Sequence, residues 1–285
     1  MYSLGFLFRQ KNIFYFALIF FYFGNSSLNA ATLTVDNGFE SGGMDGFRCS
    51  GNCPQVTTAQ KKSGKYSGDF TLTREMSTPF RTEVLLGKRK GHFEFGKEYW
   101  LGFDYRYEDW VRDSSAEAAP FQIHTTPSDW SNIKCSIRTK SGSIAARATA
   151  PVLMDSKNGQ VEIVTYGAKV RWTGPVLLKQ WINIIAHIKL SADSDGFIEM
   201  WEDGKKLFRV DGPNSPKLDG CGKALRAPYF KMGVYKWHWR AGKKATDSSR
   251  RQLFIDNLKI AVGSNGYSLV SSESTKTKTA TGVSN

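Results

Sequence analysis

The fold is indicated most clearly by the stretch YFKMGVYKW at residues 229–237. Side chains on a β-strand alternate between its two faces. The apolar side chains of Phe230, Met232 and Val234 therefore share one face, which suits a protein core. Tyr229, Lys231, Gly233, Tyr235 and Trp237 share the opposite face, which carries phenols, a cation and a flat ring. The stretch predicts a strand that covers a core on one side and presents polar chemistry on the other.

Two shorter segments earlier in the chain repeat this pattern. In Arg81-Thr82-Glu83 the charged side chains share one strand face, and in Gln122-Ile123-His124 the amide and the imidazole do so. The three segments together offer two cations, an amide, an imidazole and phenols. This set of groups suits the binding of an anionic polymer and the transfer of protons.

The rest of the chain reads as many short strands separated by turns. Turn residues such as Asp195-Gly196 and Asp211-Gly212-Pro213 recur between alternating segments, and Asp203-Gly204 lies between two strand-like segments as a strong hairpin signal. The sequence shows no long amphipathic helix, no internal repeat and no linker that would divide it. We therefore expect an all-β protein, a single jelly roll of two antiparallel sheets.

The ordered set of motifs resembles the jelly-roll polysaccharide lyases. R-T-E at residues 81–83, Q-I-H at 122–124 and Y-F-K-x-G-x-Y at 229–235 are similar to the motifs of alginate lyases of that fold. The stretches GFIEMWEDGK (196–205) and FIDNL (254–258) look more like the glucuronan lyase and heparin lyase I-like group. The resemblance covers residues 33–262. It implies a concanavalin-like sandwich with a concave substrate groove and an enzyme that cleaves acidic polysaccharides by β-elimination.

The resemblance also implies roles for four catalytic residues. Gln122 and Arg81 would neutralise the carboxylate of a uronic acid, a task for which the planar guanidinium is well suited. His124 resembles the family's base, or the neutraliser that assists it. Tyr235 resembles the residue that protonates the leaving oxygen, and in some of these lyases the tyrosine also removes the C5 proton. No cofactor is needed for this chemistry.

Six further residues are expected to bind substrate or support the site. Lys231 would bind substrate charge and lower the pKa of the Tyr235 phenol, and Glu83 would hold the guanidinium of Arg81. Gly233 would leave room for the sugar. Tyr229 is either a substrate contact or a packing tyrosine, and Trp237 and Lys236 begin an aromatic and basic cluster that either binds sugar or forms a loop.

The substrate is expected to be a polymer that contains uronic acids. Glucuronan comes first, alginate second, and a glycosaminoglycan such as heparin or heparan sulfate third. The alternative is a non-catalytic, lectin-like module on the same fold, which would not need both His124 and Tyr235. The sequence contains no recognised nucleic-acid motif, so we expect no nucleic-acid partner, and we expect a monomer.

The first 30 residues read as a signal peptide. Arg9 and Lys11 precede a short apolar run, and small residues follow at Ala30 and Ala31. The run is shorter than the about 20 residues that span a bilayer, so we expect export and no membrane attachment after cleavage. Cleavage removes two positive and no negative charges, so the net charge falls from +13 to +11. The lyase domain is expected at residues 31–265 and a disordered Ser/Thr-rich tail at 266–285. The protein is expected to be secreted or periplasmic, where a positive chain meets anionic polymers.

Four cysteines in an exported chain favour disulfides. Cys49 and Cys53 enclose a tight loop and are expected to pair, which would leave Cys135 to pair with Cys221. Three connectivities are possible.

A structural calcium ion is a further expectation. Glu40 follows the first strand and Asp256 lies in the last one, and the two ends of a jelly roll adjoin each other. Hard oxygen ligands of this kind suit calcium.

Overall fold

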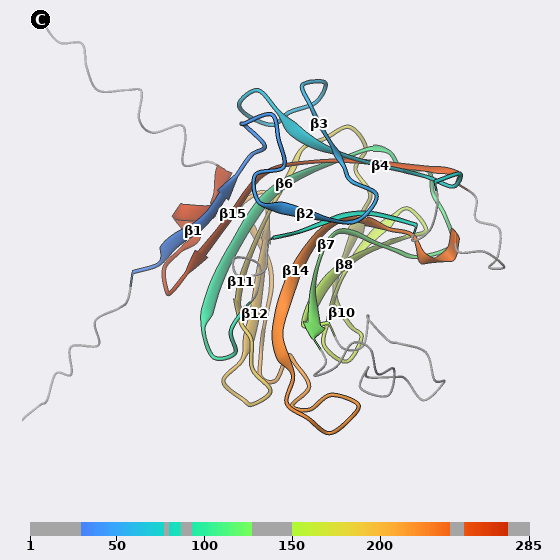
Figure 1. The fold of residues 1–285 in the computed structure, drawn as a ribbon. Coiled ribbons are helices and arrows are strands. Elements are labelled where there is room, and N and C mark those ends of the chain that lie inside the picture. Colours follow the sequence, from blue (N-terminus) through green and yellow to red (C-terminus); the bar gives the residue numbers. More distant parts are fainter. Residues whose placement is uncertain (1–29, 77–79, 87–92, 127–149, 240–247, 273–285) are drawn as a thin grey trace, which may run out of the picture.

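The computed structural model describes residues 30–76, 80–86, 93–126, 150–239 and 248–272 (Figure 1). These residues form strands, one short 3-10 helix and one short α-helix. The elements are β1 (Thr32–Asn37), β2 (Phe47–Gly51), β3 (Gln55–Thr57), β4 (Ser67–Thr73), β5 (Arg81–Leu86), β6 (Glu98–Asp109), β7 (Glu117–Thr126), β8 (Val152–Lys157), β9 (Gln160–Thr165), β10 (Lys169–Pro175), β11 (Ile182–Lys189), β12 (Phe197–Glu202), β13 (Lys205–Asp211), β14 (Arg226–Tyr235), η1 (Trp237–Trp239), β15 (Arg250–Val262) and α2 (Tyr267–Val270).

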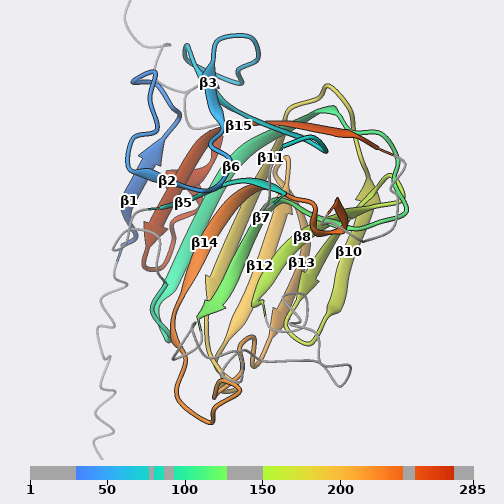
Figure 2. The ribbon, with the colours of Figure 1, turned by 45° about the vertical axis from the view of Figure 1, so that its right-hand side comes forward.

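The strands form two antiparallel sheets that pack face to face. The eight-stranded sheet has the order β13-β12-β11-β6-β15-β4-β3, with β1 paired to β15. The seven-stranded sheet has the order β10-β9-β8-β7-β14-β5-β2. Strands that are distant in sequence are neighbours in both sheets, so the chain crosses repeatedly between them, as Figures 1 and 2 show. The predicted jelly roll of two antiparallel sheets is confirmed.

The core lies between the sheets and follows the alternation of the strands. Phe230, Met232 and Val234 of β14 are at most 1% exposed, as the sequence pattern predicts. The ring of Phe121 on β7 meets the ring of Phe103 on β6 edge to face, with centroids 5.3 Å apart. Such contacts join the two sheets, and the burial of large apolar side chains supplies most of the stabilisation.

The folded domain extends beyond the predicted boundary at residue 265. The short helix α2 lies on the outer face of the eight-stranded sheet, and Val270 packs there with Trp100 and Ile185. Gly102 makes this approach possible, because a Cβ at that position would clash with the carbonyl oxygen of Val270. The expectation of a disordered tail from residue 266 is therefore wrong for residues 266–272. Residues 273–285 and the predicted signal peptide, up to residue 29, lie outside the described residues.

The disulfide prediction is confirmed for the first pair. Cys49 and Cys53 are bonded and close the short loop after β2. Cys221 is also disulfide-bonded. Its expected partner, Cys135, lies outside the described residues.

No helix in the described part of the chain has the length and apolar character needed to cross a bilayer.

Candidate functional site

Three adjacent strands bring the sequence motifs onto one surface. Strand β14 lies between β5 and β7 in the seven-stranded sheet (Figure 2). Directly opposed residues on neighbouring strands share a face. The opposed pairs are Tyr235 with Arg81, Gly233 with Glu83, Lys231 with Gln122, and Tyr229 with His124. We call the surface formed by Arg81, Glu83, Gln122, His124, Tyr229, Lys231 and Tyr235 the polar face.

Glu83 lies at the centre of the polar face and is only 1% exposed. One carboxylate oxygen accepts a hydrogen bond of 2.6 Å from Nε2 of Gln122. The other oxygen lies 3.3 Å from Nζ of Lys231 and 3.5 Å from a terminal nitrogen of Arg81. A buried carboxylate with these partners fixes the direction of all three side chains. Its burial indicates that Glu83 holds the neighbouring side chains of the polar face in position.

The guanidinium of Arg81 lies against the ring of Tyr235. Its central carbon is 4.0 Å from the ring centroid, which is a close cation–π contact. The Nε atom of Arg81 is buried and has no hydrogen-bond partner among the described residues. The side chain of Arg81 is 22% exposed, so this cation can be reached from outside. The stack places a carboxylate-binding group and a phenol side by side.

His124 is half-buried at the other end of the polar face. Its ring is nearly parallel to that of Tyr229, with centroids 5.6 Å apart. The Nδ1 atom is 3.2 Å from the carbonyl oxygen of Thr125, which can only accept. In the neutral ring the hydrogen therefore lies on Nδ1 and the lone pair on Nε2.

The environment of His124 favours the neutral imidazole. Burial, together with the positive charges of Lys231 and Arg81, lowers the pKa of His124 to about 4, although the hydrogen bond to Thr125 opposes the shift. At neutral pH the ring is therefore uncharged. An uncharged imidazole with a lone pair on Nε2 can accept a proton.

Burial also shifts the pKa values of Lys231 and Tyr229. Burial and the neighbouring Arg81 lower the pKa of Lys231, while Glu83 raises it. Burial and the charge of Glu83 raise the pKa of Tyr229, so its phenol keeps its proton. The amine of Lys231 is 5.9 Å from the Tyr229 ring centroid. These observations favour Tyr229 as a packing residue beside the site.

The structure explains the glycine at position 233 by backbone conformation and packing, which is not the predicted reason. Its φ is +125°, a backbone conformation that side-chain-bearing residues rarely adopt. A Cβ at this position would clash with the carbonyl oxygen of Thr82 and lie 2.8 Å from Phe70. The glycine is therefore required by the close packing of β14 on β5 and on the core, and the expectation that it leaves room for a sugar is wrong.

The prediction that Lys236 binds substrate is also wrong. Lys236 is 0% exposed, because alternation points it to the side opposite Tyr235. Its amine pairs with the carboxylates of Asp113 and Glu117, and Arg251 pairs with the same two acids. We call these four residues the buried ionic cluster. Trp237, in contrast, stays near the site, with its ring 5.7 Å from that of Tyr235.

The sequence did not reveal the buried ionic cluster. Asp113 and Glu117 lie in one segment, far in sequence from Lys236 and from Arg251, and the four residues form no motif. The only available signal was alternation, which placed Lys236 on the same side as Val234. Its acidic partners become apparent only when β7, β14 and β15 are seen together.

The candidate calcium ligands lie away from the polar face, at the eight-stranded sheet. A Cβ on Gly38 would lie 3.4 Å from a carboxylate oxygen of Asp256 and 3.5 Å from Cγ of Glu40, so the two acids flank this glycine. Backbone N–H groups of Lys62 and Ser63 already donate to Asp256. Among the described residues no cluster of three or more His, Cys, Asp or Glu side chains suits a metal ion. The two acids fit an incomplete ligand set, and calcium stays a prediction.

The two antiparallel sheets define a jelly roll, and the polar face carries two cations, an amide, an imidazole and phenols. The sequence model of the polysaccharide lyase family matches residues 31–259. The chain belongs to this polysaccharide lyase family, so it is a polysaccharide lyase, and the predicted resemblance is confirmed.

Solved structures of similar fold include two lyases. An endo-β-1,4-glucuronan lyase from the fungus Trichoderma reesei superposes with a TM-score of 0.62 at 18% identity, covering 84% of this chain and 98% of that one. An alginate lyase from Zobellia galactanivorans has a TM-score of 0.44 at 15% identity, covering 70% of this chain and 79% of that one. At 18% identity the likeness to the glucuronan lyase concerns the fold alone. No curated protein sequence matches the chain.

Proposed function

We propose that the polar face cleaves a uronic-acid-containing polysaccharide by β-elimination. The observation that supports this most is the placement of Arg81, Gln122, His124 and Tyr235 on one face of three neighbouring strands, with Arg81 and Gln122 held by the buried Glu83. The C5 hydrogen of a uronate is poorly acidic, because the adjacent carboxylate is already negative. An enzyme must therefore neutralise that carboxylate, accept the proton and protonate the leaving oxygen.

Each of these tasks has a candidate in the proposed mechanism. Arg81 and Gln122 bind the carboxylate and stabilise the charge that develops when the proton leaves. His124 accepts the C5 proton on Nε2, the C5–H electron pair forms the C4=C5 double bond, and the C4–O bond breaks. Tyr235 gives its proton to the leaving oxygen. Proton transfer from His124 to the resulting phenolate, through solvent, restores both groups.

Glu83 and Lys231 serve this mechanism indirectly. The carboxylate of Glu83 accepts one amide hydrogen of Gln122. This bond leaves the amide oxygen and the second amide hydrogen directed away from Glu83. Lys231 offsets the negative charge of Glu83 and attracts the acid groups of the polymer. Trp237, beside Tyr235, offers a flat surface for a neighbouring sugar.

Glucuronan is the first substrate in our proposal, followed by alginate and then by a glycosaminoglycan such as heparin or heparan sulfate. The jelly-roll likeness to the glucuronan lyase supports this order. We also propose that the protein is secreted or periplasmic, acts as a monomer, binds neither nucleic acid nor membrane, and needs no cofactor for catalysis.

The test is to incubate the protein with glucuronan, alginate, hyaluronan, heparan sulfate and heparin and to follow ultraviolet absorbance. The C4=C5 double bond conjugated to the carboxylate gives the signal. We expect signal from at least one polymer, and loss of most turnover in Tyr235→Phe with an unchanged circular dichroism spectrum. Binding of a polymer without any absorbance would instead identify a lectin-like module.

We propose a structural role for calcium if Glu40 and Asp256 bind it. Hard oxygen ligands at the junction of the first and last strands would then hold the ends of the domain together. Added calcium should raise the melting temperature, and EDTA should lower it to that of Asp256→Asn. An identical melting temperature with calcium and with EDTA would contradict this role.

A further inference from the structure

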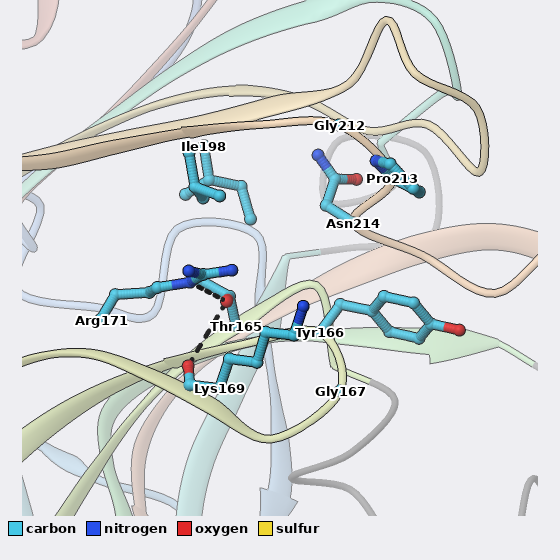
Figure 3. Close-up of a pocket in the computed structure, with 10 residues that line it drawn as sticks. Thr165, Tyr166, Gly167, Lys169, Arg171, Ile198, Gly212, Pro213 and Asn214 are labelled. Atoms are coloured by element: carbon cyan, nitrogen blue, oxygen red, sulfur yellow. Dashed lines mark hydrogen bonds between the residues drawn. The ribbon is translucent and has the colours of Figure 1, made fainter.

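A cavity lies between the edge strands β10 and β13 of the two sheets (Figure 3). Its volume is about 170 Å³. It is bounded by the turn between β9 and β10 on one side and by the segment after β13 on the other. Its lining residues are Thr165, Tyr166, Gly167, Lys169, Arg171, Ile198, Val210, Gly212, Pro213 and Asn214.

Arg171 lines this cavity together with Lys169, two residues earlier on β10, as strand alternation predicts. The register of β10 against β9 shifts between Val170 and Trp172, so Arg171 is the extra residue of a β-bulge. The Nε atom of Arg171 donates a 2.9 Å hydrogen bond to the hydroxyl of Thr165, which holds the guanidinium at the cavity, as Figure 3 shows.

The terminal nitrogens of Arg171 remain available to a ligand. Within the part of the chain that the structure describes, neither Arg171 nor Lys169 has an acidic partner, and the cavity lining contains no carboxylate. Two cations at one cavity without an acid produce a positive site for an anion. An arginine held through Nε presents its other two nitrogens as a planar fork, which matches a carboxylate.

The opposite wall of the cavity is rigid. The side chain of Asn214 accepts a hydrogen bond from the backbone N–H of Ser191 and donates to the carbonyl oxygens of Lys189 and Phe197. These three bonds fix the segment that contains Gly212 and Pro213. A fixed wall facing a fixed arginine requires little reorganisation when a ligand binds. The ring of Tyr166 adds an aromatic surface of the kind on which sugars pack.

We propose that this cavity is an accessory site for the carboxylate of an acidic sugar unit in the polymer. The proposal rests on the proposed function for the nature of the polymer. Strand β10 is separated from β7 by β9 and β8, and neighbouring strands lie about 4.8 Å apart. The cavity opens between the two sheets, on the opposite side of the seven-stranded sheet from the polar face. A chain that reaches it from His124 must therefore span several sugar units and pass round the edge strand β10. The cavity would hold such a long chain while the reacting unit lies on the polar face.

The direct test uses a small ligand that cannot react. Sodium glucuronate is titrated into isotope-labelled protein, with glucose as the neutral control, and backbone amide shifts are followed by NMR. We expect saturable shifts at residues 165–171 and 212–214 with glucuronate only, and their loss in Arg171→Gln. The matched control Lys205→Gln removes the same charge from an exposed site on β13 and should keep the shifts.

Three outcomes of the titration would overturn the proposal. The first is the absence of glucuronate-dependent shifts at these amides, and the second is equal shifts in Arg171→Gln. The third is equally tight binding of inorganic phosphate, because the cavity would then be a general anion site. None of these outcomes depends on turnover, so the accessory site can fail while the lyase mechanism holds, and the reverse is also possible.

A kinetic test then addresses chain length. A charge-assisted hydrogen bond contributes about 1.5–3 kcal/mol, and exposure reduces this, so Arg171→Gln should raise KM for a long polymer about five- to tenfold. The kcat should not change, and a trisaccharide, which is too short to reach the cavity, should show no effect. An equal change in KM for trisaccharide and polymer would contradict an accessory site.

Discussion

The neutral state of His124 makes a quantitative prediction about stability and pH. The unfolded chain binds a proton at this ring with a pKa near 6.5, whereas the folded protein does so only near 4. Between these values the unfolded state binds more protons, so acidification favours unfolding. At pH 7.5 both states are unprotonated at this ring and the contribution is absent.

The magnitude follows from the two pKa values. At pH 4.5 the unfolded ring is almost fully protonated, while most folded molecules still hold it neutral. With about 1.4 kcal/mol per pKa unit, the folded protein loses about 2.5 kcal/mol of stability at pH 4.5 through His124. Burial is the main cause, with Lys231 and Arg81 adding to it, so the loss reports directly on the environment of the polar face.

The assay is urea unfolding of the wild type and His124→Gln at pH 7.5 and pH 4.5. Glutamine does not titrate, so the variant should lose about 2.5 kcal/mol less on acidification than the wild type. Other groups that titrate in this range, such as Asp256, are common to both proteins and cancel in the comparison. An equal loss in both proteins would refute the neutral, buried imidazole and with it the assignment of His124 as a base.

Three further substitutions test how the polar face is supported. Glu83→Gln weakens the charged contacts to Gln122 and Lys231. A charged hydrogen bond contributes about 1.5–3 kcal/mol, so kcat should fall about a hundredfold in a lyase assay. An unchanged kcat would contradict the positioning role of Glu83. Lys236→Met leaves two buried carboxylates to share the single charge of Arg251 and should cost about 3–5 kcal/mol in urea unfolding, and a loss below 1 kcal/mol would contradict the cluster. Gly233→Ala should cost about 2–4 kcal/mol in the same measurement, whereas Gly46→Ala, also at positive φ but with nothing within 4 Å, should cost less.

The sequence was sufficient for the fold because alternation decides which side of a strand is buried. Phe230, Met232 and Val234 could be assigned to the core from their spacing alone, and the structure confirms it. The turn at Asp203-Gly204 also forms, between β12 and β13. Such features depend on neighbours in sequence, which is why they can be read without a structure.

The sequence was less informative where a residue depends on distant partners. Alternation brought Arg81, Gln122, His124 and Tyr235 to one face, but it could not show that Glu83 lies buried between two neighbouring strands. Arg171 is a similar case, because the hydroxyl that holds its guanidinium belongs to Thr165 on the neighbouring strand β9, and the cavity also needs the segment after β13. Strand register is set by packing across the sheet, and a single sequence does not reveal it.

The buried ionic cluster is connected to the polar face through Lys236, which follows Tyr235 directly in the chain. The backbone N–H of Lys236 donates to the carbonyl oxygen of Phe80, so the residues next to Tyr235 and Arg81 are joined at the point where those two side chains stack. The amine of Lys236 forms an ion pair with Glu117, on the side of the strand opposite the stacked side chains, and this pair holds the backbone of Lys236 in place. Stabilisation of developing charge requires donors that are fixed before the substrate binds. Residues that never contact the substrate therefore decide whether the stack of Arg81 on Tyr235 is in place to act.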